Sequence, residues 1–285
     1  MCKTLDEAFL NNSLKDKYRK LIEYLRNYKT NIVVAFSGGV DSTFLAFAAM
    51  QALGQKRVLL VTFDSPFVPR NEIEEAKKIA QIIGANHMVL KINFEDHRIW
   101  YNPPNRCYLC KRAMFETLLS YARKVFRDFT IIDGTNADDI RKYRPGLRAL
   151  KELGIKSPLA ELGFTKRDIR ILAKELNLPN WNKHSSSCLA TRIPYGELIT
   201  IEKLRKIEVA EEAIRKIVNV QLIRVRSHGN IARIEVERKM RKVFFNEEIM
   251  DKVYETLRKI GYTYVTLDLY GYREGSMDES LSRNS

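Results

Sequence analysis

The sequence has few cysteines and no long run of apolar residues. Four cysteines occur among 285 residues, too few for a disulfide framework, so we expect a reducing compartment in which thiols serve metal or redox chemistry. The apolar stretch at residues 44–53 has about half the length that a bilayer span requires. The first residues show no cleavable signal pattern. We therefore expect a soluble, cytoplasmic protein with no membrane partner.

Acidic residues are outnumbered by basic ones. Lys and Arg total 49 against 35 Asp and Glu, which gives a formal net charge of +14. Apolar residues make up 45% of the chain, enough to bury a sizeable core, so the composition excludes a disordered or fibrous protein. The length allows one large or two modest domains.

An apolar run, a glycine turn, a helical segment and a second apolar run follow one another near the start. Residues 31–36 and 57–64 predict buried strands, and the apolar segment 42–53 predicts a helix between them. This order makes a βαβ unit, which requires a parallel sheet.

The same alternation continues along the chain. Asn71 and Glu74 form a capping-box pattern before a further helix, and residues 87–92 and 129–133 predict two more strands. The fold class predicted for residues 1–195 is therefore α/β, a doubly wound parallel sheet.

The periodicity changes after residue 195. The pattern predicts helices and strands in mixed order, at residues 200–218, 221–227, 231–236, 246–260 and 263–269. We expect residues 196–285 to form a small α+β domain that serves substrate binding or oligomerisation.

A glycine turn with two serines and an aspartate follows the first predicted strand. Backbone N–H groups and the helix dipole converge there, so an anion is the expected ligand. Gly38 and Gly39 let the backbone approach phosphate oxygens, and Ser37 and Ser42 add hydroxyl donors. Asp41 can hold Mg²⁺ that bridges those oxygens. The loop has neither the Walker lysine nor a GxGxxG pattern.

This hexapeptide, SGGVDS, resembles the PP-loop of the ATP pyrophosphatases. The resemblance implies an adenine nucleotide α-hydrolase-like fold with ATP and Mg²⁺ as cofactors. A substrate oxygen would attack the α phosphorus, pyrophosphate would leave in the loop, and the adenylated intermediate would pass to a nucleophile. It also implies that Phe63 faces the adenine and that Asp133 and Gly134 line the pocket. All three residues lie at the carboxyl ends of predicted parallel strands, where such sheets bind ligands.

Two cysteines form a C-x-x-C motif that we expect immediately before a helix over residues 112–125. Thiolates are stabilised beside a helix N-terminus. Cys107 and Cys110 alone fit zinc, an iron–sulfur cluster, a redox dithiol or coincidence. Cys188 is a candidate third ligand. Either His184 completes a Cys₃His zinc site, or the three thiolates hold a four-iron cluster with one iron open.

Basic residues crowd the stretch 98–148, which holds 11 Lys or Arg against 5 Asp or Glu. A solvated helix face explains this as readily as a site that collects several phosphates. In the second domain Arg224 and Arg226 alternate along a strand and so share one face. Such a pair can clamp a phosphate, although paired arginines also occur on the wet faces of sheets.

Further segments, in order through both domains, resemble the LarE family, ATP-dependent sulfur transferases that make the nickel-pincer nucleotide cofactor. They lie at residues 133–134, 143–147, 181–183, 186–192, 194–196, 224–226, 231–235 and 264–269. The resemblance implies that ATP activates a carboxylate of pyridinium-3,5-biscarboxylic acid mononucleotide and that sulfur insertion then gives a thiocarboxylate. It also implies a homo-oligomer.

The same resemblance assigns further residues. We count Arg144 among the ATP-binding residues. Arg224 and Arg226 would bind the phosphate of the small nucleotide substrate, with Glu211 as a further candidate for that site.

The chain departs from the single-cysteine members of that family in its sulfur source. Those members sacrifice the sulfur of one cysteine, and this chain carries Ser187 at that position with Cys188 beside it. With Cys107 and Cys110 it resembles the three-cysteine branch, which holds a four-iron four-sulfur cluster. We therefore expect these three cysteines to be both the metal ligands and the catalytic residues. The sequence does not identify the sulfur donor.

Three other functions are compatible with parts of the sequence. Related PP-loop enzymes that thiolate tRNA also use three cysteines, but no zinc ribbon or RNA-binding module is visible, so nucleic acid is not the expected partner. An amide-forming synthetase that uses ammonia would share the loop and have no need of the cysteines. A nucleotide-binding sensor would bind ATP without converting it to AMP and pyrophosphate.

Overall fold

A computed structural model of the chain describes residues 12–141 and 145–277. The contacts within the chain define two compact units. The first unit comprises Met1–Phe94 and Cys107–Ser185, and the second unit comprises Glu95–Arg106 and Ser186–Ser285. The domain boundary that we predicted at residue 195 stays a prediction. No helix within the described ranges is long and apolar enough to cross a membrane.

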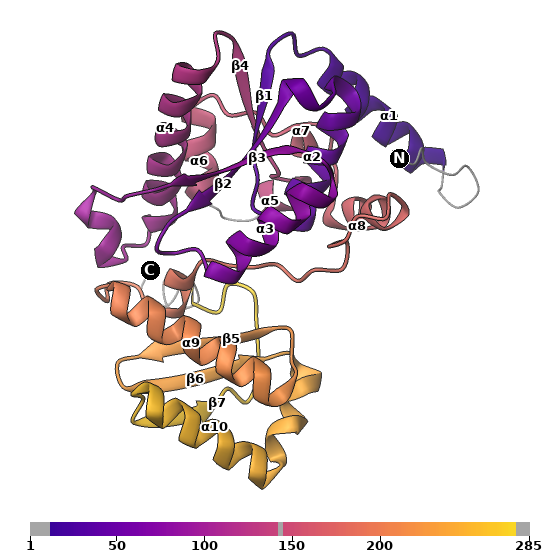
Figure 1. The fold of residues 1–285 in the computed structure, drawn as a ribbon. Coiled ribbons are helices and arrows are strands. Elements are labelled where there is room, and N and C mark those ends of the chain that lie inside the picture. The colour runs from indigo at the N-terminus through magenta and orange to yellow at the C-terminus, as the bar shows by residue number, and fades with distance from the viewer. Residues whose placement is uncertain (1–11, 142–144, 278–285) are drawn as a thin grey trace. The chain divides into compact units, whose positions relative to one another are not determined.

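The first unit is built on a four-stranded parallel sheet, drawn in Figure 1. Its strands are β1 (Asn31–Ala35), β2 (Val58–Asp64), β3 (Asn86–Lys91) and β4 (Phe129–Asp133). Their order is β3-β2-β1-β4, so the direction of crossover reverses between β1 and β4. The predicted α/β fold with a doubly wound parallel sheet is confirmed. Ligands of such sheets bind at the carboxyl ends of the strands beside this reversal.

Helices cover both faces of this sheet, as Figure 1 shows. The helices on one face are α1 (Asn12–Arg26), α2 (Val40–Leu53), α3 (Arg70–Ile82) and α8 (Lys166–Glu175). The other face carries α4 (Arg106–Val125) and α6 (Pro145–Glu152), and two short helices, α5 (Ala137–Ile140) and α7 (Pro158–Glu161), lie in the connections. Because both faces are covered, the strands are almost continuously apolar, as their sequences require.

Two predicted helix starts are wrong. Helix α3 begins at Arg70 with Pro69 in the N-cap position, so Asn71 lies inside the helix and does not cap it. Helix α4 begins at Arg106, so Cys107 and Cys110 lie within the helix instead of before it. For α4 the physical reason is the pair of prolines at residues 103–104, because a helix can start shortly after them and no helix breaker follows.

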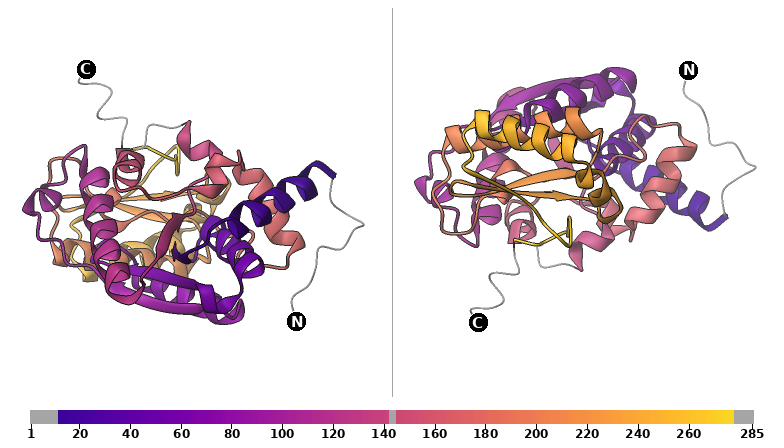
Figure 2. Two further views of the ribbon diagram at one scale, coloured as in Figure 1. Left: turned by 90° about the horizontal axis from the view of Figure 1, so that it is seen from above. Right: turned by 90° about the horizontal axis from the view of Figure 1, so that it is seen from below.

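The second unit is a small α+β structure, as predicted. Its strands are β5 (Ile223–His228), β6 (Ile231–Val236) and β7 (Tyr264–Leu267), in the order β5-β6-β7. The pair β5/β6 is antiparallel and β6/β7 is parallel. Helices α9 (Ile201–Val218) and α10 (Glu247–Ile260) pack side by side on one face, visible in the right-hand view of Figure 2. Strand β5 of this sheet carries the two predicted phosphate-binding arginines, Arg224 and Arg226.

Candidate functional site

The glycine loop connects β1 to α2 and is held by its own hydroxyl groups. The hydroxyls of Ser37 and Ser42 lie 3.2 Å apart, and Ser42 donates to the carbonyl of Gly39 at 3.1 Å. Gly39 is the N-cap of α2, and no side chain of the described residues caps that helix. The N–H groups of its first turn therefore remain available to an anion, and the predicted phosphate site stays a prediction.

Two glycines at this loop are required by close packing. Gly38 has a φ of +69°, and a Cβ there would lie 2.9 Å from the Cα of Ala76 on α3. A Cβ on Gly134, directly after β4, would lie 2.9 Å from the backbone nitrogen of Ser42. The segment after β4 thus lies against the start of α2, which brings two of the predicted ATP-binding segments together at the reversal of the sheet.

Asp41 is a partly buried carboxylate, and one of its two oxygens has a hydrogen-bond partner. Its Oδ2 accepts a hydrogen bond from the ammonium of Lys166 on α8. Its Oδ1 is buried and has no hydrogen-bond partner among the described residues. Burial raises the pKa of Asp41 above its ordinary value, and the nearby Lys166 opposes that shift. A buried carboxylate oxygen without a partner beside a phosphate loop fits the donor set that Mg²⁺ requires.

Asp133 is tied into the edge of the sheet. Its carboxylate accepts hydrogen bonds from the hydroxyls of Ser157 and Thr135, both at 2.6 Å. The ammonium of Lys111 on α4 lies 3.9 Å from its Oδ2. Asp133 therefore fixes the turn that leads into Gly134, and it places a cation at the same edge of the sheet.

Of the other two predicted ATP-binding residues, the structure describes Phe63 but not Arg144. The ring of Phe63, on β2, packs edge-on against Phe115 of α4, with the ring centroids 5.3 Å apart. Phe63 is half-buried and lies next to the last residue of its strand. Arg144 lies outside the described residues. Both assignments stay predictions.

The C-x-x-C motif occupies the first turns of α4. Cys107 and Cys110 are half-exposed cysteines outside any disulfide, three residues apart in a helix, and so lie on the same face. The Sγ of Cys110 lies 3.6 Å from the sulfur of Met114, one turn further on. Gly146 of α6 packs directly on this turn, since a Cβ there would lie 2.9 Å from the side chain of Lys111. Two accessible thiols on one helix face suit the binding of a soft metal centre.

Cys188 lies in the second unit, at the N-cap of the short 3₁₀ helix η3 (Leu189–Arg192). It is a half-exposed free thiol. The guanidinium of Arg192 is buried and donates to the carbonyls of Ser187 and Cys188 at 2.8 and 2.9 Å. These bonds fix the backbone on both sides of the thiol.

Arg192 also connects the cysteine turn to helix α9 and strand β5. Its Nε and Nη2 donate to the two carboxylate oxygens of Glu211, at 2.8 and 3.1 Å. Glu211 accepts a third hydrogen bond from the backbone N–H of Val225, between the two predicted phosphate-binding arginines. Although burial opposes it, the charge of Arg192 lowers the pKa of Glu211. This pair is one rigid link between Cys188 and the strand.

The two arginines of β5 are both buried, not exposed on a wet face. Arg226 donates to one carboxylate oxygen of Glu235 through two nitrogens, at 3.0 and 2.8 Å, and to the carbonyl of Thr191 at 2.8 Å. The guanidinium of Arg224 lies over the ring of Tyr272, 5.6 Å from its centroid. Burial, with the neighbouring charge of Arg192, lowers the pKa of Arg224 to about 10. A bound anion would relieve that destabilisation of the charged form.

The three predicted metal ligands are divided between the units. Cys107 and Cys110 belong to the first unit, and Cys188 belongs to the second. Within residues 12–141 and 145–277, no group of three or more His, Cys, Asp or Glu side chains is arranged to hold a metal ion. The metal site of three cysteines therefore stays a prediction, while Cys188 and the predicted phosphate clamp are brought together within one unit.

Several residues of these sites were not singled out from the sequence. Lys166, Asn180 and Arg192 contact the predicted site residues from 125, 142 and 4 positions away along the chain. The sequence signal for Lys166 is its position directly after the N-cap Thr165 of α8. Nothing in the sequence pattern marks Asn180.

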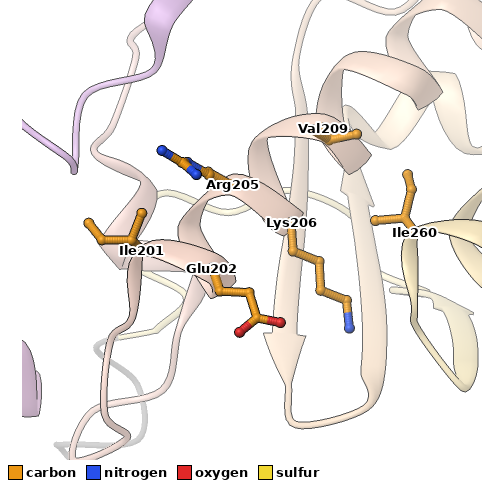
Figure 3. A pocket seen from close by; sticks show the side chains of 6 residues that line it. All are labelled: Ile201, Glu202, Arg205, Lys206, Val209 and Ile260. Atoms are coloured by element: carbon orange, nitrogen blue, oxygen red, sulfur yellow. The ribbon is translucent and has the colours of Figure 1, made fainter.

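A pocket of about 600 Å³ lies elsewhere on the second unit, and Figure 3 shows the side chains that line it. Its lining comes from one face of α9 and the end of α10: Ile201, Glu202, Arg205, Lys206, Val209 and Ile260. None of these residues belongs to the predicted sites.

Comparison with known proteins gives matches at two scales. The family described as NAD synthase matches residues 13–100, which contain the glycine loop. The chain is 35% identical over 274 residues to the pyridinium-3,5-bisthiocarboxylic acid mononucleotide synthase of Lactiplantibacillus plantarum. The aligned region covers 95% of this chain and 97% of that protein.

Two uncharacterized proteins are also similar over most of their length. One, from Synechocystis sp., is 41% identical over 88% of this chain and 93% of its own. The other, from Methanocaldococcus jannaschii, is 35% identical over 93% of this chain and 96% of its own.

Proposed function

The chain belongs to the family of the pyridinium-3,5-bisthiocarboxylic acid mononucleotide synthase, the LarE family, and from this we propose how it works as an ATP-dependent sulfur transferase. Its substrate is a pyridinium carboxylate mononucleotide. ATP adenylates one carboxylate, and sulfur then replaces an oxygen to give a thiocarboxylate. The observation that carries the proposal is the link through Arg192 between the Cys188 turn and the two arginines of β5.

The first unit supplies the adenylation step. The N–H groups at the start of α2 and the hydroxyls of Ser37 and Ser42 would hold the β and γ phosphates of ATP. Asp41 Oδ1 would hold the Mg²⁺ that offsets their charge. A carboxylate oxygen of the substrate attacks the α phosphorus, and the pyrophosphate departs into the loop. Phe63, Asp133, Gly134 and Arg144 complete the proposed nucleotide site.

The second unit binds the phosphate of the substrate. Arg224 and Arg226 alternate along β5, so they share one side of the strand; Arg224 lies over the ring of Tyr272, and Arg226 pairs with Glu235. Glu211 acts through Arg192 and Val225 and is a positioning residue in this proposal. The arginines would thus orient the adenylated carboxylate relative to Cys188.

Sulfur is delivered by the three cysteines. We propose that Cys107, Cys110 and Cys188 hold a four-iron four-sulfur cluster, since half-exposed reduced thiols provide the required ligands. When bound, such a cluster supplies a sulfide nucleophile that can be replenished. The thiocarboxylate forms as AMP leaves with the original carboxylate oxygen. A cytoplasmic location, which keeps thiols reduced, and a homo-oligomer are parts of the same proposal.

The reaction itself is tested by supplying the proposed acceptor. Protein purified without oxygen is incubated with MgATP and pyridinium-3,5-biscarboxylic acid mononucleotide. The nucleotides are then separated and their masses are measured by mass spectrometry. We expect AMP and pyrophosphate in equal amounts and an acceptor in which sulfur has replaced oxygen. Formation of an amide with added ammonia, or salt-sensitive retention of tRNA, would instead favour one of the two rival enzymes.

The metal proposal is tested separately by iron and acid-labile sulfide content. We expect about four of each per chain, lost in Cys107→Ser, Cys110→Ser and Cys188→Ser. The matched control is Cys2→Ser, which changes the fourth cysteine of the chain, and it should retain both iron and sulfide. Stoichiometric zinc, or no metal in the native chain, would overturn the cluster and leave the adenylation proposal standing.

A further inference from the structure

A buried side chain among the last residues of the first unit contacts the glycine loop. The amide nitrogen of Asn180 donates to the carbonyl of Gly38 at 2.9 Å and to the hydroxyl of Thr43, on α2, at 3.0 Å. Asn180 is 4% exposed. The orientation of its amide is fixed, because the Gly38 carbonyl can only accept a hydrogen bond.

This contact determines which way the peptide between Gly38 and Gly39 faces. In a trans peptide the C=O and the N–H point in opposite directions. Since Asn180 holds the Gly38 carbonyl toward itself, the Gly39 N–H is directed to the other side. That N–H makes a long bond, 3.3 Å, to the Ser37 hydroxyl. A phosphate oxygen can replace such a bond, whereas a carbonyl turned toward the phosphates would repel them.

Gly38 makes this control necessary. Glycine has no Cβ and adopts positive φ as readily as negative φ, so nothing in its own conformation fixes the orientation of its carbonyl. The constraint comes instead from a residue 142 positions away. The other end of that residue's amide, Oδ1, is buried and has no partner among the described residues.

The segment that carries Asn180 is anchored a second time, through side chains that do not belong to the loop. The ammonium of Lys183 donates to Glu72 and Glu75 of α3, at 2.7 and 2.9 Å. Arg170 of α8 donates to the carbonyl of Lys183 at 2.9 Å. The two anchors can therefore be removed independently, one at the loop and one at the helices.

We propose that Asn180 is a positioning residue that holds the glycine loop in its phosphate-accepting conformation and so makes the site prefer ATP over AMP. The inference rests on the proposed function, in which this loop holds the β and γ phosphates. Asn180 itself touches neither phosphate.

The test measures binding of MgATP and of AMP by calorimetry, for the wild type, Asn180→Ala and Asn180→Leu. Both variants remove the donor to Gly38, and neither adds a charge. We expect MgATP to bind about tenfold more weakly in each, the size of effect of one hydrogen bond, and AMP affinity to stay unchanged. Leucine has the branched shape of the asparagine side chain, so Asn180→Leu distinguishes loss of the donor from an empty space.

Lys183→Gln is the matched control, since it loosens the same segment without touching the loop. It should leave both affinities unchanged. An equal loss of ATP and AMP affinity in the Asn180 variants, or the same loss of ATP affinity in Lys183→Gln, would overturn the role of Asn180. A wild-type chain that binds no ATP would overturn the proposed function itself, and the positioning role with it.

Discussion

The two sites of this chain are made of different chemical groups. The glycine loop in the first unit offers backbone N–H groups and hydroxyls, with one carboxylate, Asp41, beside it. The site in the second unit consists of buried charged side chains, three arginines against two glutamates: Arg192, Arg224, Arg226, Glu211 and Glu235. The first site depends on the shape of the backbone, and the second depends on charges that have been removed from water.

This difference predicts different costs of change. A neutral loop loses ligand affinity when its shape changes, while the unit around it can stay folded. A buried ion pair that loses one partner leaves an uncompensated charge, so the unit itself is destabilised. We therefore expect substitutions at the loop to change ligand affinity and substitutions at the buried ion pairs to change the stability of the second unit.

The largest effect is expected for Glu211→Gln. Arg192 would keep its buried charge and lose both carboxylate contacts, so we expect the free energy of unfolding of the second unit to fall by about 3–5 kcal/mol. The measurement is urea denaturation. Glu197→Gln is the control, because its 2.7 Å pair with Lys203 is partly exposed and should contribute less than about 1 kcal/mol. Equal losses in the two variants would contradict the comparison.

Next is Gly38→Ala, paired with Gly154→Ala. Both glycines have a φ of +69°, so each alanine costs about 1 kcal/mol in backbone strain. Gly154 has nothing within 4 Å of its added Cβ, whereas Gly38 would contact Ala76 at 2.9 Å, which we expect to add about 1–3 kcal/mol. ATP-dependent release of pyrophosphate should therefore be lost only in Gly38→Ala. If Gly154→Ala loses as much activity as Gly38→Ala, backbone strain alone explains why residue 38 is a glycine.

A smaller effect concerns Arg224. Because burial and Arg192 lower its pKa to about 10, the folded state disfavours its charge, and Arg224→Met should be as stable as the wild type without ligand. Inorganic phosphate at ten times its Kd should stabilise the wild type by about 1.4 kcal/mol and Arg224→Met not at all. The exposed Arg205 provides the control Arg205→Met, which should respond like the wild type. Full stabilisation of Arg224→Met would remove this residue from the phosphate site.

The smallest effect is a pH dependence in the first unit. Burial, with the charge of Lys77, lowers the pKa of His87 below 6.5, so the unfolded chain takes up the proton first. The stability that His87 contributes is then present above about pH 6.5 and is lost as the pH falls. Thermal unfolding between pH 5 and 7 should show this slope, and His87→Gln should reduce it. An unchanged slope in His87→Gln would remove this residue from the pH dependence.

Much of the first site could be predicted because it is local. The apolar run of β1, the glycine turn and the start of α2 follow one another in the sequence, so the loop and its carboxylate were visible before the fold. The hold of Asn180 on Gly38 joins residues 142 positions apart and leaves no pattern in either segment.

The second site shows the opposite limit. The alternation of Arg224 and Arg226 gave their shared face, but it could not show that both are buried or that Glu235 neutralises one of them. Arg192 was visible only as part of a longer motif, and its pairing with Glu211 depends on how η3 packs against α9. The start of α4 was missed because prolines mark where a helix can begin without fixing the residue at which it does.

The most direct test of cluster-borne sulfur transfer is a single turnover without a sulfur donor. The masses of the nucleotide product and of the intact protein are both measured by mass spectrometry. We expect one thiocarboxylate and one AMP for each sulfur transferred, iron-bound sulfide as the sulfur consumed, and a chain whose mass is unchanged at Cys188. A chain that has lost the sulfur of Cys188, or an acceptor that gains no sulfur while ATP is consumed, would contradict it.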